Sequence, residues 1–185
     1  MIVIYVTPIR NIVFMVGLVP RIVSLANDLP GVNLALSLHA PTQDLRVQIV
    51  PAARAYNLLK LMAAIDCYSA ASKRQVFIEY IMIGGVNDSD EAAHQLGSLL
   101  SGRQVVLNLI PYNPTETKAD FKASREDAVH NFQKTIREMG QDIAGACGQL
   151  AVGDLKRTSL SARKVSLDIP DIEELFTVPG RRMVK

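Results

Sequence analysis

The sequence predicts an α/β fold in which mostly parallel strands are covered by helices, as a partial barrel or an open sheet. Strand-like and helix-like stretches alternate along the chain. The strand-like stretches are short and nearly continuously apolar, as in parallel strands that are buried on both faces. Three or four such units are visible, too few to close an eight-stranded barrel.

Length and composition fit one soluble domain. The chain has 185 residues, of which 49% are hydrophobic and 21% charged, enough to form a core. Its net charge of +2 gives no argument for nucleic acid binding. The two cysteines form neither a disulfide framework nor a metal-site spacing, so we expect a reducing compartment. The apolar opening, residues 1–6, is too short for a signal peptide or a membrane span.

The first half of the chain contains two predicted strands and two predicted helices. Residues 11–15 form a short apolar strand, and residues 18–29 have helical spacing that ends at Pro30-Gly31. Residues 32–39 alternate apolar and polar side chains, which indicates a strand. Asn57 can cap the second helix, whose apolar face consists of Leu58, Leu61, Met62 and Ile65.

Two further strands lie on either side of a third helix. Residues 75–83 are β-branched and apolar, and Gly84-Gly85 closes this strand. Either Asp88 or Ser89 opens the helix that follows. Residues 104–110 form the next buried strand.

The last predicted helix follows a loop over residues 112–123. Ser124 and Asp127 form a variant of the capping box, and the helix ends before Gly140. Beyond it the periodicity fades. We therefore assign residues 1–150 to one core domain and residues 151–185 to a C-terminal tail of mixed charge.

Chemistry in such folds collects at the carboxyl ends of the strands. His39 is either a core histidine or a ligand contact. Glu79 lies inside an apolar strand, where it can be a general base with a raised pKa or a structural partner of Arg46 or Arg54. The residues predicted at this edge are Ser37, His39, Gly84, Gly85, Asn87, Asp88, Asn108, Tyr112 and Asn113.

Five segments in a fixed order carry a resemblance to a known family. They are LALSLHAP (34–41), RVQIVPAAR (46–54), EYIMIGGVND (79–88), LNLIPYNP (107–114) and GQDIAGACGQL (140–150). Together they resemble the radical S-adenosylmethionine methyltransferases that methylate carbon 2 of adenine in large-subunit ribosomal RNA and transfer RNA. The resemblance runs from about residue 8 to residue 150 and includes features of the plant relatives.

The resemblance implies roles for particular residues. Ser37, Leu38, His39 and Asn113 match positions that contact S-adenosylmethionine, and Cys147 matches the cysteine that carries the methyl group. It also implies a partial barrel of the radical S-adenosylmethionine type and a 4Fe–4S cluster. The implied partners are ribosomal and transfer RNA, with no membrane, and we expect a monomer. The implied location is the cytoplasm, or the plastid stroma in a plant.

The chain also departs from the family pattern. It has no CxxxCxxC loop, so it contains no ligands for the cluster and no metal site is expected. In the family a β-α unit with a GMGEP motif follows the segment that matches residues 11–15, and a short strand follows the helix near residues 137–139; both are missing from this sequence. The sequence therefore indicates a truncated version of the family.

Two alternatives to an active methyltransferase remain open. The chain can be a truncated or alternatively spliced, catalytically inactive fragment that binds S-adenosylmethionine or RNA weakly. A different class of function is an unrelated partial-barrel enzyme that uses Glu79 and His39 as acid and base.

Overall fold

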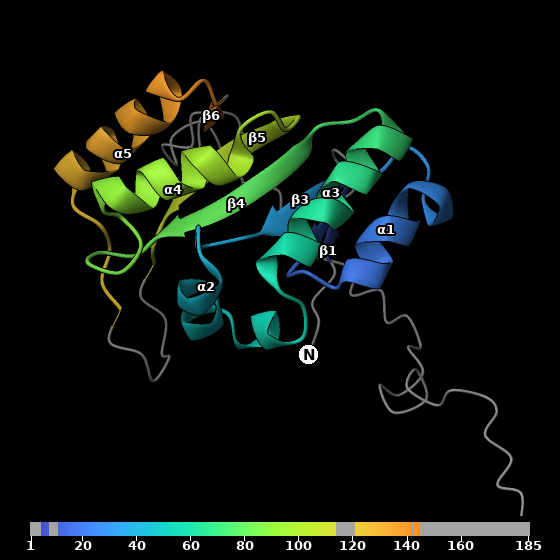
Figure 1. Cartoon of the computed structure of the whole chain (residues 1–185), viewed down its shortest axis with the longest axis horizontal. Helices are drawn as coiled ribbons and strands as arrows, with labels where there is room; N and C mark the ends of the chain where they lie inside the picture. Colours follow the sequence, from blue (N-terminus) through green and yellow to red (C-terminus); the bar gives the residue numbers. More distant parts are fainter. Residues whose placement is uncertain (1–4, 8–10, 114–120, 142, 145–185) are drawn as a thin grey trace, which may run out of the picture.

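The computed structural model describes residues 5–7, 11–113, 121–141 and 143–144 (Figure 1). They form a six-stranded sheet whose strands follow one another in chain order. β1 pairs with β2 antiparallel, and every later neighbouring pair is parallel. The strands are β1 Tyr5–Thr7, β2 Ile12–Met15, β3 Asn33–Ser37, β4 Val76–Met82, β5 Val105–Pro111 and β6 Ile143–Ala144. The prediction of an α/β fold with mostly parallel strands is confirmed.

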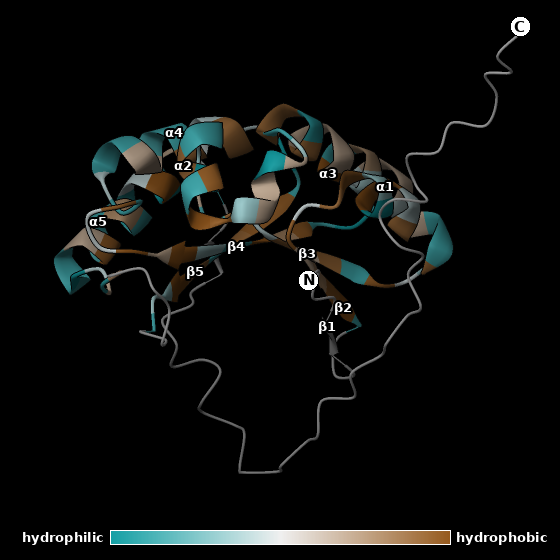
Figure 2. Ribbon diagram, turned by 90° about the horizontal axis from the view of Figure 1, so that it is seen from below, coloured by the Kyte–Doolittle hydropathy of each residue, from teal (hydrophilic) through white to brown (hydrophobic). Residues whose placement is uncertain are grey.

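This strand order determines where the helices lie. Crossover connections between parallel strands are right-handed, so strands added always in the same direction place their helices on the same face. Figure 2 shows the helices together on one face of the sheet. We call the other face the open face, because no helix within the described residues covers it. The helices are α1 Val19–Asp28, α2 Gln43–Ile49, the 3₁₀ helix η1 Pro51–Arg54, α3 Leu58–Ser72, α4 Asp90–Leu100 and α5 Glu126–Glu138.

The core lies between the sheet and the helices. Side chains alternate between the two faces along each strand. In β4 the helix side therefore receives Val76, Ile78, Tyr80 and Met82, all fully buried. Phe132 of α5 packs its ring 5.5 Å from that of Tyr80. No helix in the described part of the chain is long and apolar enough to cross a membrane.

The caps of α3 and α4 follow the sequence prediction. Asn57 caps α3, because its side-chain oxygen accepts the backbone N–H of Lys60 at 2.9 Å. Of the two candidates for α4, Ser89 is the cap and accepts the N–H of Ala92 at 3.2 Å. The Asp88 carboxylate instead accepts the N–H of Gly85 in the preceding turn.

The predicted capping box of α5 is wrong. The residue before this helix is Arg125, and no side chain caps it. Ser124 lies one residue too early, and its buried hydroxyl oxygen has no hydrogen-bond partner among the described residues. Asp127 pairs with Arg125 at 3.1 Å and accepts the N–H of Ala128. It therefore stabilises the first turn in another way.

Other differences concern short elements. The predicted strand over residues 32–39 ends at Ser37, because His39 has a φ of 60° and leaves the extended conformation. Four short elements, β1, β6, α2 and η1, are not apparent from the sequence. Each has seven residues or fewer, too few to show a periodicity.

Replacement of Gly84 tests the close packing at the end of β4. Its N–H donates to the carbonyl of Lys122 at 2.8 Å, and an added Cβ would lie 2.8 Å from the carbonyl oxygen of Ala123. Because that oxygen belongs to the backbone, Gly84→Ala is expected to lower the free energy of unfolding by roughly 1–3 kcal/mol in urea denaturation.

Gly85→Asn is the matched control. Gly85 has a φ of 71° and free space around it, and asparagine tolerates this conformation better than other side chains. It should cost less than Gly84→Ala. Equal denaturation midpoints for the two variants would contradict the prediction.

Candidate functional site

A buried arginine ties together the carboxyl ends of β2 and β3. Thr42 caps α2, because its hydroxyl accepts the N–H of Leu45, and Arg46 lies one turn into this helix. Arg46 is 1% exposed. Its guanidinium donates to three backbone carbonyls, those of Val16 at 2.6 Å, Ser37 at 3.1 Å and Leu38 at 3.1 Å. We call this arrangement the Arg46 clamp.

In the clamp, the dipoles of backbone carbonyl groups stabilise the buried positive charge of Arg46. Burial lowers the pKa of Arg46 to about 10, so the guanidinium remains protonated at neutral pH. Carbonyl oxygens accept its hydrogen bonds, and no ion pair in the described part of the chain contains Arg46. The prediction that Glu79 forms an ion pair with Arg46 or Arg54 is therefore wrong.

His39 follows directly after the clamped segment. Its Nδ1 accepts the backbone N–H of Ile81 at 3.2 Å, which places the proton of the neutral ring on Nε2. Burial and the charge of Arg46 lower the pKa of His39 to about 4, and the backbone carbonyl of Glu79 offsets part of this effect. The ring is therefore neutral at physiological pH and offers a donor, not a charge.

Asn87 joins the ends of β3 and β4 from inside the protein. Its amide nitrogen donates to the carbonyls of His39 at 2.8 Å and Ile81 at 2.7 Å, and its amide oxygen accepts the N–H of Ile83 at 2.7 Å. The hydroxyl of Tyr80 donates to the backbone carbonyl of Asn87. Because Asn87 is fully buried, its role is structural.

The other residues predicted to contact the ligand differ in their solvent exposure. Ser37 is half-buried at the end of β3. Leu38 is fully buried, its N–H donates to the carbonyl of Glu79, and its carbonyl accepts from Arg46. Asn113 is exposed and lies just past the end of β5. The structure thus places Ser37, His39 and Asn113 at the carboxyl edge of the sheet, and Leu38 serves there as an anchor.

Two further predictions concern a catalytic cysteine and metal ligands. Cys147 lies outside the described residues. Within the described ranges, no three His, Cys, Asp or Glu side chains gather as metal ligands would. Cys67, the cysteine that the structure describes, is exposed on α3.

Glu79 has its hydrogen-bond partner on the next strand. Asn108 of β5 donates its amide N–H to Oε2 of Glu79 at 2.7 Å. Burial raises the pKa of Glu79, and this hydrogen bond opposes part of the rise. Sequence reasoning singled out both residues but did not pair them, because the pairing depends on the register of β4 with β5.

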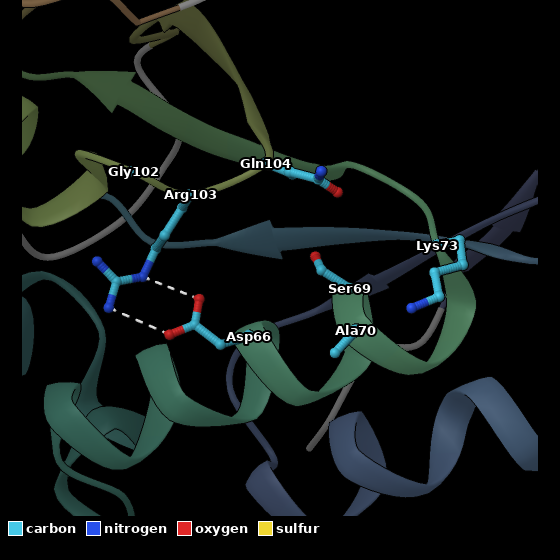
Figure 3. Close-up of a pocket in the computed structure, with 7 residues that line it drawn as sticks. All are labelled: Asp66, Ser69, Ala70, Lys73, Gly102, Arg103 and Gln104. Atoms are coloured by element: carbon cyan, nitrogen blue, oxygen red, sulfur yellow. Dashed lines mark hydrogen bonds and ion pairs between the residues drawn. The ribbon is translucent and has the colours of Figure 1, made fainter.

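A pocket at the opposite end of the strands is a less suitable site. It lies where α3 ends and β5 begins, and it contains none of the predicted ligand residues (Figure 3). Its main feature is the ion pair of Asp66 and Arg103, with contacts of 3.0 and 3.2 Å. In parallel α/β folds ligands bind at the carboxyl ends of strands, so we take the edge containing Ser37 and His39 as the candidate site.

Removal of the Arg46 side chain tests the clamp. Arg46→Met keeps the length of the apolar stem but leaves three carbonyl oxygens without their donor. We expect the free energy of unfolding to fall by at least ~3 kcal/mol in urea denaturation. Arg54→Met, at an exposed arginine of η1, is the control and should change it little. Similar losses in both variants would show that the clamp does not stabilise the fold.

The lowered pKa of His39 predicts a pH dependence of stability. The unfolded chain takes up a proton near the ordinary pKa of 6.5, whereas the folded chain does so only near 4. Stability therefore falls as the pH drops through this interval. Between pH 7 and pH 5 the wild type should lose roughly 2 kcal/mol more than His39→Asn.

Asparagine is chosen because it accepts the positive φ of this position and retains a hydrogen-bond acceptor. His94→Asn, at an exposed histidine of α4, is the control. Identical pH profiles for the wild type and His39→Asn would contradict the burial of a neutral ring.

The chain is similar in sequence and in structure to one group of methyltransferases. No protein-family model matches the chain. Its sequence is 40% identical over 159 residues to a probable dual-specificity RNA methyltransferase RlmN from Listeria welshimeri. It is 43% identical over 145 residues to the protein of the same name from Caldicellulosiruptor saccharolyticus. These matches cover 80% and 73% of this chain but only 43% and 42% of the relatives.

Solved structures agree with the sequence comparison. A radical SAM methyltransferase from Sphaerobacter thermophilus superposes with a TM-score of 0.69 at 42% identity, over 71% of this chain and 38% of that one. A domain of a pyruvate-formate lyase-activating enzyme from Bacteroides vulgatus has a TM-score of 0.52 at 13% identity, over 65% of this chain and 71% of that one. This likeness concerns the fold alone. The chain spans less than half the length of the curated relatives. It is homologous, over most of its own length, to one part of the radical SAM RNA methyltransferases of the RlmN type.

Proposed function

We propose that this chain provides the S-adenosylmethionine-binding edge of a radical enzyme that methylates carbon 2 of adenine in ribosomal and transfer RNA. The observation that carries the proposal is the position of Ser37, His39 and Asn113. All three lie at or just past the carboxyl ends of parallel strands, where α/β folds bind their ligands. The similarity to a probable dual-specificity RNA methyltransferase, which covers 80% of this chain, supports the proposal.

The residues at this edge fit a neutral, polar recognition of S-adenosylmethionine. Ser37 offers a hydroxyl, His39 an Nε2–H donor, and Asn113 an amide with both donor and acceptor atoms. The Arg46 clamp and Asn87 hold the backbone of residues 37–39 on both sides. The backbone of this segment is thus held in place before the ligand arrives, which reduces the entropy cost of binding.

The residues of this sequence do not fit an iron–sulfur cluster. A 4Fe–4S cluster of this kind needs three thiolates close together, whereas the sequence contains two cysteines, Cys67 and Cys147. We therefore derive no radical step from these residues. In our proposal Cys147 carries the methyl group, and the cytoplasm or plastid stroma is the compartment.

This misfit supports a second candidate function. The chain is then a non-catalytic binder of S-adenosylmethionine that retains the ligand edge without the cluster. The two candidates share the edge at Ser37 and His39 and differ only in chemistry.

Calorimetric titration with S-adenosylmethionine tests the ligand edge. We expect the purified chain to bind it, and Asn113→Ala to bind about tenfold more weakly, because one or two hydrogen bonds are lost. Asn131→Ala, at an exposed position of α5, is the matched control and should bind like the wild type. Absence of binding by the wild type would refute the proposal.

Anaerobic reconstitution with iron and sulfide separates the two candidates. A brown protein with stoichiometric cluster absorbance that methylates an RNA fragment would favour the enzyme. A colourless protein that still binds S-adenosylmethionine would favour the non-catalytic binder.

A further inference from the structure

A polar row crosses the open face of the sheet. Ser37 of β3 is in register with Glu79 of β4, which is in register with Asn108 of β5. Side chains of residues in register on neighbouring strands lie on the same face and are close to each other. Glu79 alternates with Ile78 and Tyr80, which face the helices, so the row lies on the open face.

Apolar side chains border this row. Two residues before Glu79 and Asn108 in β4 and β5 are Phe77 and Val106, and two residues after them are Ile81 and Ile110. All four are partly exposed, in contrast to their fully buried neighbours on the helix side. The open face therefore presents a narrow polar strip between two apolar strips.

Glu79 is a carboxyl group with no cation beside it in the described part of the chain. It is 9% exposed, and no ion pair in the described part of the chain contains it. Asn108 occupies one of its carboxylate oxygens. Within the described ranges, the other oxygen of Glu79 and the amide oxygen of Asn108 accept no side-chain hydrogen bond. Both atoms are acceptors, so the row can bind a ligand that brings a donor.

A desolvated carboxylate without a counter-charge is costly, and two outcomes relieve the cost. One is uptake of a proton, which agrees with the raised pKa of Glu79. The other is a ligand that brings N–H donors. Ser37 belongs both to this row and to the proposed ligand edge, so a ligand at the edge reaches the row directly.

We propose that Glu79, held in place by Asn108, binds an amino or ammonium group of the ligand, whose apolar part lies against the neighbouring strips. This inference rests on the proposed function, in which the ligand is S-adenosylmethionine. That molecule has two groups of the required chemistry, the α-ammonium group of its amino-acid part and the amino group of its adenine. Glu79 selects for ligands that carry such a group.

Titration of Glu79→Gln with S-adenosylmethionine tests the inference. Glutamine keeps the shape of the side chain and an acceptor for Asn108, but it removes the charge. We expect binding to weaken by about tenfold or more, because a charge-assisted hydrogen bond is lost. The melting temperature should stay the same or rise, because an unpaired buried charge disappears. A residue with only a structural role would not separate binding from stability in this way.

Glu138→Gln is the matched control, because Glu138 is exposed on α5 and forms only a 3.9 Å surface ion pair with Lys134. It should bind like the wild type. If the wild type binds and Glu79→Gln binds equally well, this inference fails while the proposed function stands. If the wild type does not bind, both fail.

A second ligand identifies the group that Glu79 recognises. 5′-Methylthioadenosine contains the adenine amino group but lacks the α-ammonium group. A loss of affinity for it in Glu79→Gln, followed by NMR titration, would support recognition of adenine. An unchanged affinity for it, together with weaker binding of S-adenosylmethionine, would support recognition of the ammonium group.

Discussion

The buried guanidinium of Arg46 is the interaction on which the carboxyl edge of the sheet depends. It joins α2 to the ends of β2 and β3 through hydrogen bonds to three backbone carbonyl oxygens. Because Ser37 and Leu38 both accept from it, the position of His39 follows from the clamp. Asn87 holds the same segment from the side of β4. The geometry of the candidate site is therefore set by buried polar groups and less by the core.

The polar residues near this edge fall into two kinds. Arg46 and Asn87 are fully buried and use their hydrogen-bonding groups within the protein. The side chains of Ser37, Glu79 and Asn108 retain acceptor atoms that no side-chain hydrogen bond occupies within the described residues. Satisfied buried groups give rigidity, whereas unsatisfied ones mark places where a ligand can contribute binding energy. This difference separates the supporting residues from the candidate contacts.

The long elements could be predicted from the sequence, and the details of the site could not. β4, β5 and the helices α1, α3 and α4 have patterns long enough to identify them, and Asn57 and Ser89 act locally. The left-handed turn at His39 depends on Ile81, which is 42 residues away in the chain. The pairing of Glu79 with Asn108 likewise depends on strand register. Such long-range partners leave no periodic signal, and so the sequence offered Arg46 or Arg54 as a partner of Glu79, neither of which pairs with it.

The order of the strands also has a consequence for how the chain folds. Each strand pairs with the one before it in the sequence, so every sheet contact joins neighbouring segments. Loop-closure entropy is therefore small at each step, compared with sheets whose first and last strands are adjacent. During synthesis, each completed β-α unit can dock on the edge left by the previous one. The sheet can thus form in chain order, with each new strand pairing with the strand that precedes it in the sequence.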